Sequence, residues 1–159
     1  MSVYRPTTSF QTGIQFPEDA CVVLVRTRWN AAIVDALESG SRKVLSEAGL
    51  NCIVINVPGA FEIPFAIRMH ASKSAHKPLA YIALGCVLRG DTPHFDYVCK
   101  GVTDGIVQLN QTLPMPVIFG ILTVDNEQQA SDRIGGKHGH KGEEAAHTAL
   151  EMIHLIQSF

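Results

Sequence analysis

The sequence predicts an α/β protein with three layers, α/β/α, in which helices cover both faces of a four-stranded parallel sheet. Four short runs are apolar almost throughout, which is typical of strands buried on both faces. Longer segments, in which apolar residues recur every three or four positions, separate these runs and are expected to be helices. Strands that alternate with helices in this way form parallel sheets.

The N-terminal part of the chain differs from the rest. Residues 1–19 are polar, contain Pro6, Gly13 and Pro17, and are expected to form an extended arm that could add a strand to a sheet edge, in its own chain or a neighbour. Residues 20–159 are expected to form one domain. The 159-residue chain is 46% hydrophobic and can bury a sizeable core, and no linker or repeat divides it.

The first half of this domain is expected to contain two strands and two helices. Gly49 ends the first helix, and Pro58 and Gly59 close the second strand. Glu62 and Pro64 fall in the first turn of the second helix, where an acid is favoured by the helix dipole. The strands are expected at 20–27 and 50–57, and the helices at 30–48 and 61 to about 74.

The second half continues the alternation. The third strand stops at Arg89, after which Thr92 supplies an N-cap and Pro93 the proline favoured at the first helical position. Pro114 and Pro116 precede the fourth strand. The strands are expected at 81–88 and 117–123, the helices at 94–112, 125–134 and 143–157, and a glycine-rich loop at 135–142.

The connections between the strands should set the topology. Right-handed crossovers lead to a doubly wound, flavodoxin-like sheet. A four-stranded sheet this apolar often packs against other subunits, so we expect a homo-oligomer.

The composition argues against several classes of protein. A formal net charge of -2 with dispersed Lys and Arg argues against a nucleic-acid partner. No apolar run approaches the ~20 residues of a membrane span, and the N-terminus lacks the hydrophobic core of a signal peptide. The 4 cysteines form no Cys-x-x-Cys pair and are expected to be reduced, mostly buried thiols in a cytoplasmic protein.

The chemistry is expected where the strands end. In such a sheet the strand-to-helix junctions meet at one end, in the crevice where ligands bind. His94 lies in the first turn of a helix, where unpaired backbone N–H groups attract phosphate and an imidazole can move protons near neutral pH. This combination suggests chemistry on a phosphorylated small molecule. The junctions are residues 28–30, 58–62, 89–94 and 123–126.

Five motifs make the sequence similar to the lumazine synthase family of riboflavin biosynthesis. They cover nearly the whole chain from about residue 21, in the order and spacing of the family. The motifs are Arg-Trp-Asn at 28–30, Val-Pro-Gly-Ala-Phe-Glu-Ile-Pro at 57–64, Leu-Gly-Cys-Val-Leu-Arg-Gly-Asp-Thr-Pro-His-Phe at 84–95, Pro-Val-Ile-Phe-Gly-Ile-Leu-Thr at 116–123 and Arg-Ile-Gly-Gly-Lys-His-Gly-His-Lys-Gly at 133–142.

This resemblance implies an enzyme of the penultimate step of riboflavin biosynthesis. It would condense 5-amino-6-(D-ribitylamino)uracil with 3,4-dihydroxy-2-butanone 4-phosphate to 6,7-dimethyl-8-ribityllumazine, releasing phosphate and water. No cofactor and no metal are implied. The family assembles as pentamers with sites between neighbours, and some members close into icosahedral shells. Riboflavin synthase is a candidate partner.

The resemblance also implies a proton-transfer residue and a phosphate site. His94 corresponds to the residue that moves protons. The backbone N–H groups of Asp91 and Thr92, the Thr92 hydroxyl and the Arg133 guanidinium correspond to the phosphate site. Asp91 stands where some members carry a small residue, so its side chain is expected to point outward. Without the resemblance, Arg133 beside Asp132 would be taken for a solvated surface residue.

The remaining residues that the resemblance assigns contact the ribitylaminouracil. Read alone, Trp29 could be a core aromatic at a strand end and Phe119 a plain core residue. The family instead has a stacking aromatic at Trp29, ribityl contacts at Ala60, Phe61 and Glu62, contacts to the uracil edge at Cys86, Val87 and Leu88, and an aromatic from the adjacent subunit at Phe119.

A metal site is disfavoured, and two other interpretations stay open. His138, His140 and His147 invite a metal site, but they lack the closed ligand set of zinc sites; Lys141 in the same region is a plausible auxiliary cation. An archaeal-type riboflavin synthase shares the fold but has no phosphate substrate. A flavin-binding or shell-forming paralogue would keep the fold without turnover.

Overall fold

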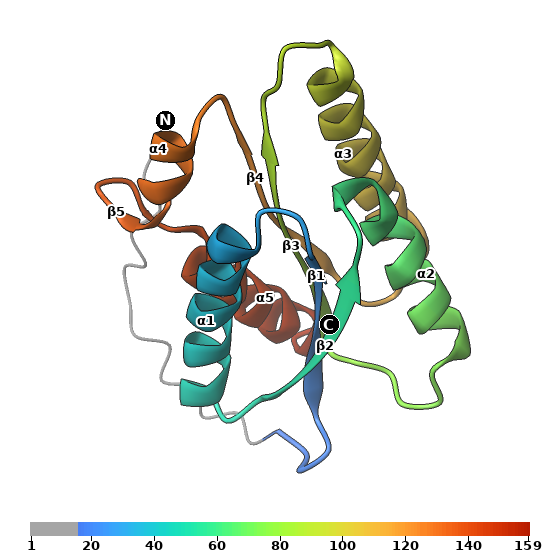
Figure 1. The fold of residues 1–159 in the computed structure, drawn as a ribbon. Helices are drawn as coiled ribbons and strands as arrows, with labels where there is room; N and C mark the ends of the chain where they lie inside the picture. Colours follow the sequence, from blue (N-terminus) through green and yellow to red (C-terminus); the bar gives the residue numbers. More distant parts are fainter. Residues whose placement is uncertain (1–15) are drawn as a thin grey trace.

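Four parallel strands form the central sheet, in the order β2-β1-β3-β4 (Figure 1). The computed structural model describes residues 16–159, so residues 1–15 of the predicted arm lie outside the described part of the chain. This order is the flavodoxin-like one, and the predicted fold class is confirmed. The strands are β1 (Cys21–Thr27), β2 (Asn51–Val57), β3 (Ala80–Leu88) and β4 (Val117–Val124).

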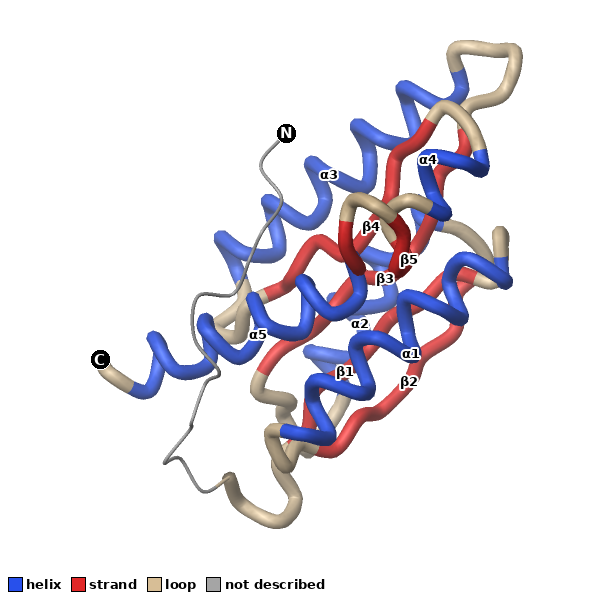
Figure 2. The backbone as a smooth tube through the Cα atoms, turned by 90° about the vertical axis from the view of Figure 1, so that its left-hand side faces the viewer, coloured by secondary structure: helices blue, strands red, loops and turns tan. Residues whose placement is uncertain are grey.

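Helices cover both faces of the sheet. Figure 1 shows α1 and α5 on one face and α2 and α3 on the other, and Figure 2 shows α1 and α5 side by side. Each predicted helix is present, although the fourth is shorter at both ends than predicted. The helices are α1 (Ala31–Glu47), the 3-10 turn η1 (Ala60–Glu62), α2 (Ile63–Lys73), α3 (His94–Thr112), α4 (Glu127–Ser131) and α5 (Lys141–Gln157).

The sheet separates two apolar clusters. Because side chains alternate along a strand, Val22 and Leu24 of β1 pack in the cluster under α1 and α5, whereas Val23 and Val25 pack under α2 and α3. The same alternation holds along β3. These two inner strands are buried almost throughout, as their apolar sequences predict.

The edge strand β2 departs from the expectation that every strand is covered on both faces. Its residues are mostly exposed or half-buried, and Ile53 is 43% exposed. Its edge position alone is not the cause, because β4 is the other edge strand and is mostly buried. The helices that flank the sheet cover β2 less than α3 and α5 cover β4. An apolar sequence at a sheet edge leaves backbone groups and side chains available to another segment.

The predicted glycine-rich loop at 135–142 is corrected by the structure. Two short strands, β5 (Ile134–Gly136) and β6 (Gly139–His140), pair as an antiparallel hairpin. Gly135 and Gly139 have φ of 111° and 83°, which other residues rarely adopt. The last helix begins at Lys141, two residues earlier than predicted, with the ring of His140 accepting a hydrogen bond from the Glu143 amide.

The start of α5, which follows this hairpin, packs closely against α1. A Cβ on Gly142 would overlap the backbone of Leu37, so only glycine lets the helices approach this far. The buried Ser41 hydroxyl donates to the Gly142 carbonyl (2.9 Å), and the His140 ring fills the space over Gly40.

The remaining sequence expectations concern membranes and thiols. Within residues 16–159, no helix combines the length and apolar character needed to cross a membrane. Cys21 and Cys86 are buried, and Cys52 and Cys99 are half-buried; all four are free.

Candidate functional site

A pocket opens at the carboxyl ends of β1 and β3, between the turn η1 and the start of α3. Its volume is about 490 Å³, and it lies where ligands bind in open α/β sheets. Nine of the residues predicted for the site line it together. They are Trp29, Ala60, Phe61, Glu62, Cys86, Val87, Leu88, Thr92 and His94.

Trp29 lines the pocket with an exposed ring. It is 66% exposed, so the reading of Trp29 as a core aromatic is wrong. The ring lies over Gly59, where a Cβ would come within 3.0 Å of two ring carbons. Gly59 thus gives the indole room, and the free surface of the ring can stack on a flat heterocycle.

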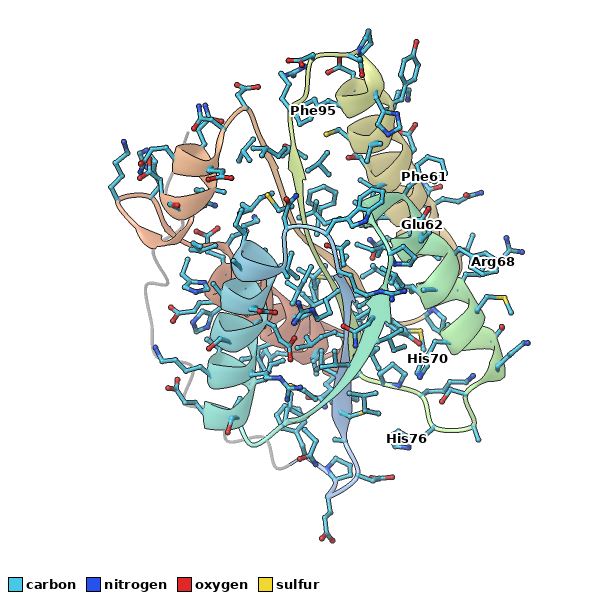
Figure 3. The ribbon with its side chains drawn as sticks, viewed as in Figure 1. Phe61, Glu62, Arg68, His70, His76 and Phe95 are labelled. Carbon is cyan, nitrogen blue, oxygen red and sulfur yellow. The ribbon has the colours of Figure 1, made fainter. Side chains whose placement is uncertain are left out.

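Glu62 closes the β2-to-α2 junction. Its Oε2 accepts a hydrogen bond from the Gly59 amide (3.1 Å), so the side chain reaches back over the first turn. Phe61 is 61% exposed beside it. Figure 3 shows Phe61, Glu62 and Phe95 toward one end of the α2 and α3 layer, and His70 and His76 toward the other. An acid and two aromatics therefore gather at the end of the sheet that carries the pocket.

Asn30 ties two junctions together, and the sequence singled it out only as part of a motif. It has φ of 56°, a left-handed conformation that asparagine tolerates better than most residues. Its side chain makes no helix cap; Nδ2 instead donates to the carbonyl of Cys86 (2.8 Å). Backbone hydrogen bonds also link this region to the junction after β2. The Arg28 amide donates to the Val57 carbonyl (2.9 Å), and the Trp29 amide donates to the Pro58 carbonyl (3.4 Å).

The β3-to-α3 junction presents His94 and Thr92 to the pocket. The helix begins at His94 with Pro93, not Thr92, at the N-cap position, which corrects the predicted cap. The Thr92 hydroxyl still accepts a hydrogen bond from the His94 amide (3.4 Å). The described residues supply no acceptor for the backbone N–H groups of Asp91 and Thr92, so this helix start can receive an anion.

Three predicted site residues do not line the pocket of the single chain. Asp91 is exposed beside it. Phe119 of β4 lines a separate shallow groove with Lys100 and Thr103 of α3. Arg133 follows α4, where its guanidinium holds both carboxylate oxygens of Glu144 (3.1 and 3.0 Å) and donates to the His138 carbonyl.

The pocket also contains residues to which the sequence analysis assigned no role in the site. Thr27 is buried and its hydroxyl donates to the Trp29 carbonyl (3.2 Å), which holds the turn that carries the indole. Phe95 follows His94 directly, and Tyr97 lies three positions after His94 on the same face of α3. This helical spacing could have indicated Tyr97 from the sequence. The added lining residues are Thr27, Asn30, Gly90, Phe95, Tyr97 and Val98.

The charge state of the pocket thiol limits its chemistry. Burial raises the pKa of Cys86 to about 11, so the thiol stays protonated at neutral pH and is a poor nucleophile. No group of three His, Cys, Asp or Glu side chains within residues 16–159 is arranged to hold a metal ion. Groups in the pocket that suit proton transfer or anion binding include His94, the Glu62 carboxylate and the start of α3.

These features define an α/β protein with a pocket at the carboxyl edge of its parallel sheet, lined by an exposed indole, an imidazole and the start of a helix. The sequence profile of the 6,7-dimethyl-8-ribityllumazine synthase family matches residues 19–157. The chain belongs to this family.

Individual relatives agree with the family assignment. The 6,7-dimethyl-8-ribityllumazine synthase of Porphyromonas gingivalis is 49% identical over 141 residues, covering 87% of this chain and 86% of its own. The enzyme of Bacteroides fragilis is 47% identical over 138 residues, covering 85% and 95%. That of Stenotrophomonas maltophilia (strain R551-3) is 39% identical over 151 residues, covering 93% and 96%.

Proposed function

We propose that the pocket between β1, β3, η1 and α3 is the active site of a 6,7-dimethyl-8-ribityllumazine synthase. As a member of this family, the chain condenses 5-amino-6-(D-ribitylamino)uracil with 3,4-dihydroxy-2-butanone 4-phosphate and releases phosphate and water. The observation that carries the site assignment is the convergence of Trp29, Glu62, Thr92 and His94, from three separate junctions, on one pocket.

The pyrimidine half of the pocket binds the ribitylaminouracil. Trp29 offers an exposed ring for stacking, and Cys86, Val87 and Leu88 bring the end of β3 to the edge of the heterocycle. Ala60 and Phe61 hold the ribityl chain beside Glu62. The Glu62 carboxylate retains acceptor capacity for ribityl hydroxyls, because only one of its oxygens caps Gly59.

The phosphate half of the pocket binds the four-carbon substrate. The backbone N–H groups of Asp91 and Thr92 and the Thr92 hydroxyl receive the phosphate, and the dipole of the 19-residue helix α3 favours its charge. His94 accepts and returns protons as the amine attacks the ketone, the imine forms with loss of one water, phosphate departs and the ring closes with loss of a second water.

A second copy of the chain completes the site. Phe119 and Arg133 lie outside the pocket of their own chain, so we assign them to the pocket of a neighbour. The open edge of β2 provides a further surface for contact between copies. We propose that the chain forms a cytoplasmic homopentamer. Further proposals are that pentamers assemble into a shell and that the assembly binds riboflavin synthase.

A single assay tests the reaction. The purified chain is mixed with both substrates while absorbance of the lumazine and release of inorganic phosphate are followed together. Equal amounts of lumazine and phosphate are expected. A chain that forms no product is a binding protein, and one that converts lumazine alone catalyses the following step; either result contradicts the proposed function.

A further inference from the structure

Arg89 connects three parts of the structure without lining the pocket. It follows the last residue of β3, and its amide donates to the Val124 carbonyl at the end of β4 (2.9 Å). Its Nε lies 2.7 Å from Oδ1 of Asp125, and its Nη1 lies 3.3 Å from Oδ1 of Asp96. The guanidinium lies over the Phe95 ring, with Cζ 4.0 Å from the ring centroid.

These contacts span the loop that carries the phosphate and proton-transfer groups. Residues 90–93 separate Arg89 from α3, and Asp96 lies in the first turn of that helix. The side chain therefore joins the beginning of the loop to its far end, and Asp125 anchors it to the neighbouring strand. Phe95 lies next to His94 in sequence and lines the pocket, so Arg89 also fixes one wall of the site.

We propose that Arg89 is a positioning residue of the reaction. It holds the first turn of α3 so that Thr92 and His94 face the pocket, and it acts through Phe95 and Asp96 without touching either substrate. This inference rests on the proposed function of the pocket.

The geometry favours arginine over any other cation. A guanidinium can donate to two acids in its plane while its face stacks on an aromatic ring, whereas a lysine ammonium offers a point charge without such a face. An isolated surface ion pair contributes little to stability, so stability alone gives a weak reason for this arrangement. Three contacts that converge on one loop can instead restrict its orientation.

Arg42 provides a matched control. Its side chain is 48% exposed, close to the 43% of Arg89, and it too pairs with an acid, Glu38, at 2.6 Å. It lies on α1, outside the pocket lining. Loss of an exposed, paired arginine can thus be compared at two places, of which only one borders the loop.

The test compares Arg89→Ala, Arg89→Lys and Arg42→Ala in the full-length protein. We expect Arg89→Ala to lower kcat by about ten-fold, within the ~10²-fold that a misplacement of ~1 Å can cause, with KM for the ribitylaminouracil nearly unchanged. Arg89→Lys should recover part of the loss, and Arg42→Ala should turn over like the wild type. Asp125→Asn, which leaves Arg89 in place, should give a smaller loss and serves if Arg89→Ala does not fold.

Hydrogen exchange of the substrate-free protein gives a readout independent of turnover. The hydrogen-bonded amides of residues 96–98 should exchange faster in Arg89→Ala, and those in the rest of α3 should not. Unchanged exchange and kcat, or faster exchange throughout the protein with an equal loss of thermal stability, would overturn the positioning role. An inactive wild type refutes the proposed function instead, and the exchange result still decides whether Arg89 orders the first turn.

Discussion

The side chain of Asn30 donates a hydrogen bond from Nδ2 to the carbonyl oxygen of Cys86, at 2.8 Å and across 56 positions of sequence. The bond joins the end of β1 to the end of β3 at the base of the pocket. Asn30 can make it because it adopts φ of 56°, which turns its side chain away from the usual capping position. One residue thus supplies both a backbone conformation and a link between junctions.

Two substitutions at Asn30 separate these contributions. Asn30→Gly keeps the left-handed conformation and loses the hydrogen bond, so the free energy of unfolding should fall by about 1 kcal/mol. Asn30→Ala loses the hydrogen bond and disfavours the left-handed conformation, which costs alanine roughly 1 kcal/mol more. The free energy of unfolding of this variant should therefore fall by about 2 kcal/mol. Urea unfolding measures both values. Equal stability of Asn30→Gly and the wild type would show that the bond contributes nothing.

Removal of the imidazole at position 94 should slow the reaction without abolishing binding. His94→Ala should lower kcat at saturating substrate by about 10²–10⁴-fold, the usual contribution of a positioned acid or base. Substrate binding can be followed by the fluorescence of Trp29, because the chain has 1 Trp and it lines the pocket. Retained binding with slow turnover is expected, while an unchanged kcat would remove His94 from the mechanism.

Mixing two impaired variants tests whether neighbouring copies share a site. Arg133→Ala should raise KM for the phosphate-bearing substrate, because a bidentate cation is lost. If His94 and Arg133 serve a site from different chains, random reassembly of His94→Ala with Arg133→Ala restores both residues at about a quarter of the sites. At a concentration of the phosphate-bearing substrate well below the raised KM, activity of the reassembled mixture should exceed that of either variant alone. No gain after confirmed subunit exchange would place both residues in a site within one chain.

A half-buried histidine that contacts a buried tyrosine at the opposite end of the sheet makes stability depend on pH. His70 Nδ1 and the hydroxyl of the fully buried Tyr81 lie 2.9 Å apart. Burial, with a smaller effect of Lys77, lowers the pKa of His70, and burial raises the pKa of Tyr81 to about 12. At a pH between the lowered pKa of folded His70 and its unfolded pKa, the imidazole is therefore mostly neutral in the folded state and mostly protonated in the unfolded chain.

The direction of the pH effect follows from the lowered pKa of His70. Below the unfolded value of about 6.5, the unfolded state binds more protons, so the free energy of unfolding falls as pH falls toward the folded pKa. Urea unfolding at pH 7.5 and at pH 5 should show this loss, and His70→Gln should reduce it. An identical pH dependence in His70→Gln would assign the effect to other groups.

The sequence predicted the parts of the site that depend on local structure. Strand ends, turn residues and helix starts are set within a few residues, which is why Trp29, Glu62, Thr92 and His94 were expected at one edge and line one pocket. The contacts of Asn30 depend on residues far along the chain and were not visible in the sequence pattern. The same is true of Arg89, whose partner Asp125 lies 36 positions away.

Other differences arise from features that strand and helix periodicity does not encode. The hairpin of β5 and β6 is too short to give a strand pattern, and its glycines suggested a loop. β2 is largely exposed because the flanking helices cover it less than they cover β4, and its apolar sequence does not reveal this packing. Phe119 and Arg133 were assigned by resemblance alone, and their distance from the pocket makes their roles depend on a neighbouring copy.

The position of bound phosphate tests the central claim most directly. Crystals of the protein soaked in inorganic phosphate should show the anion at the start of α3, bonded to the backbone N–H groups of Asp91 and Thr92 and to the Thr92 hydroxyl, with His94 beside it. Phosphate bound elsewhere, with this helix start left empty, would contradict the account.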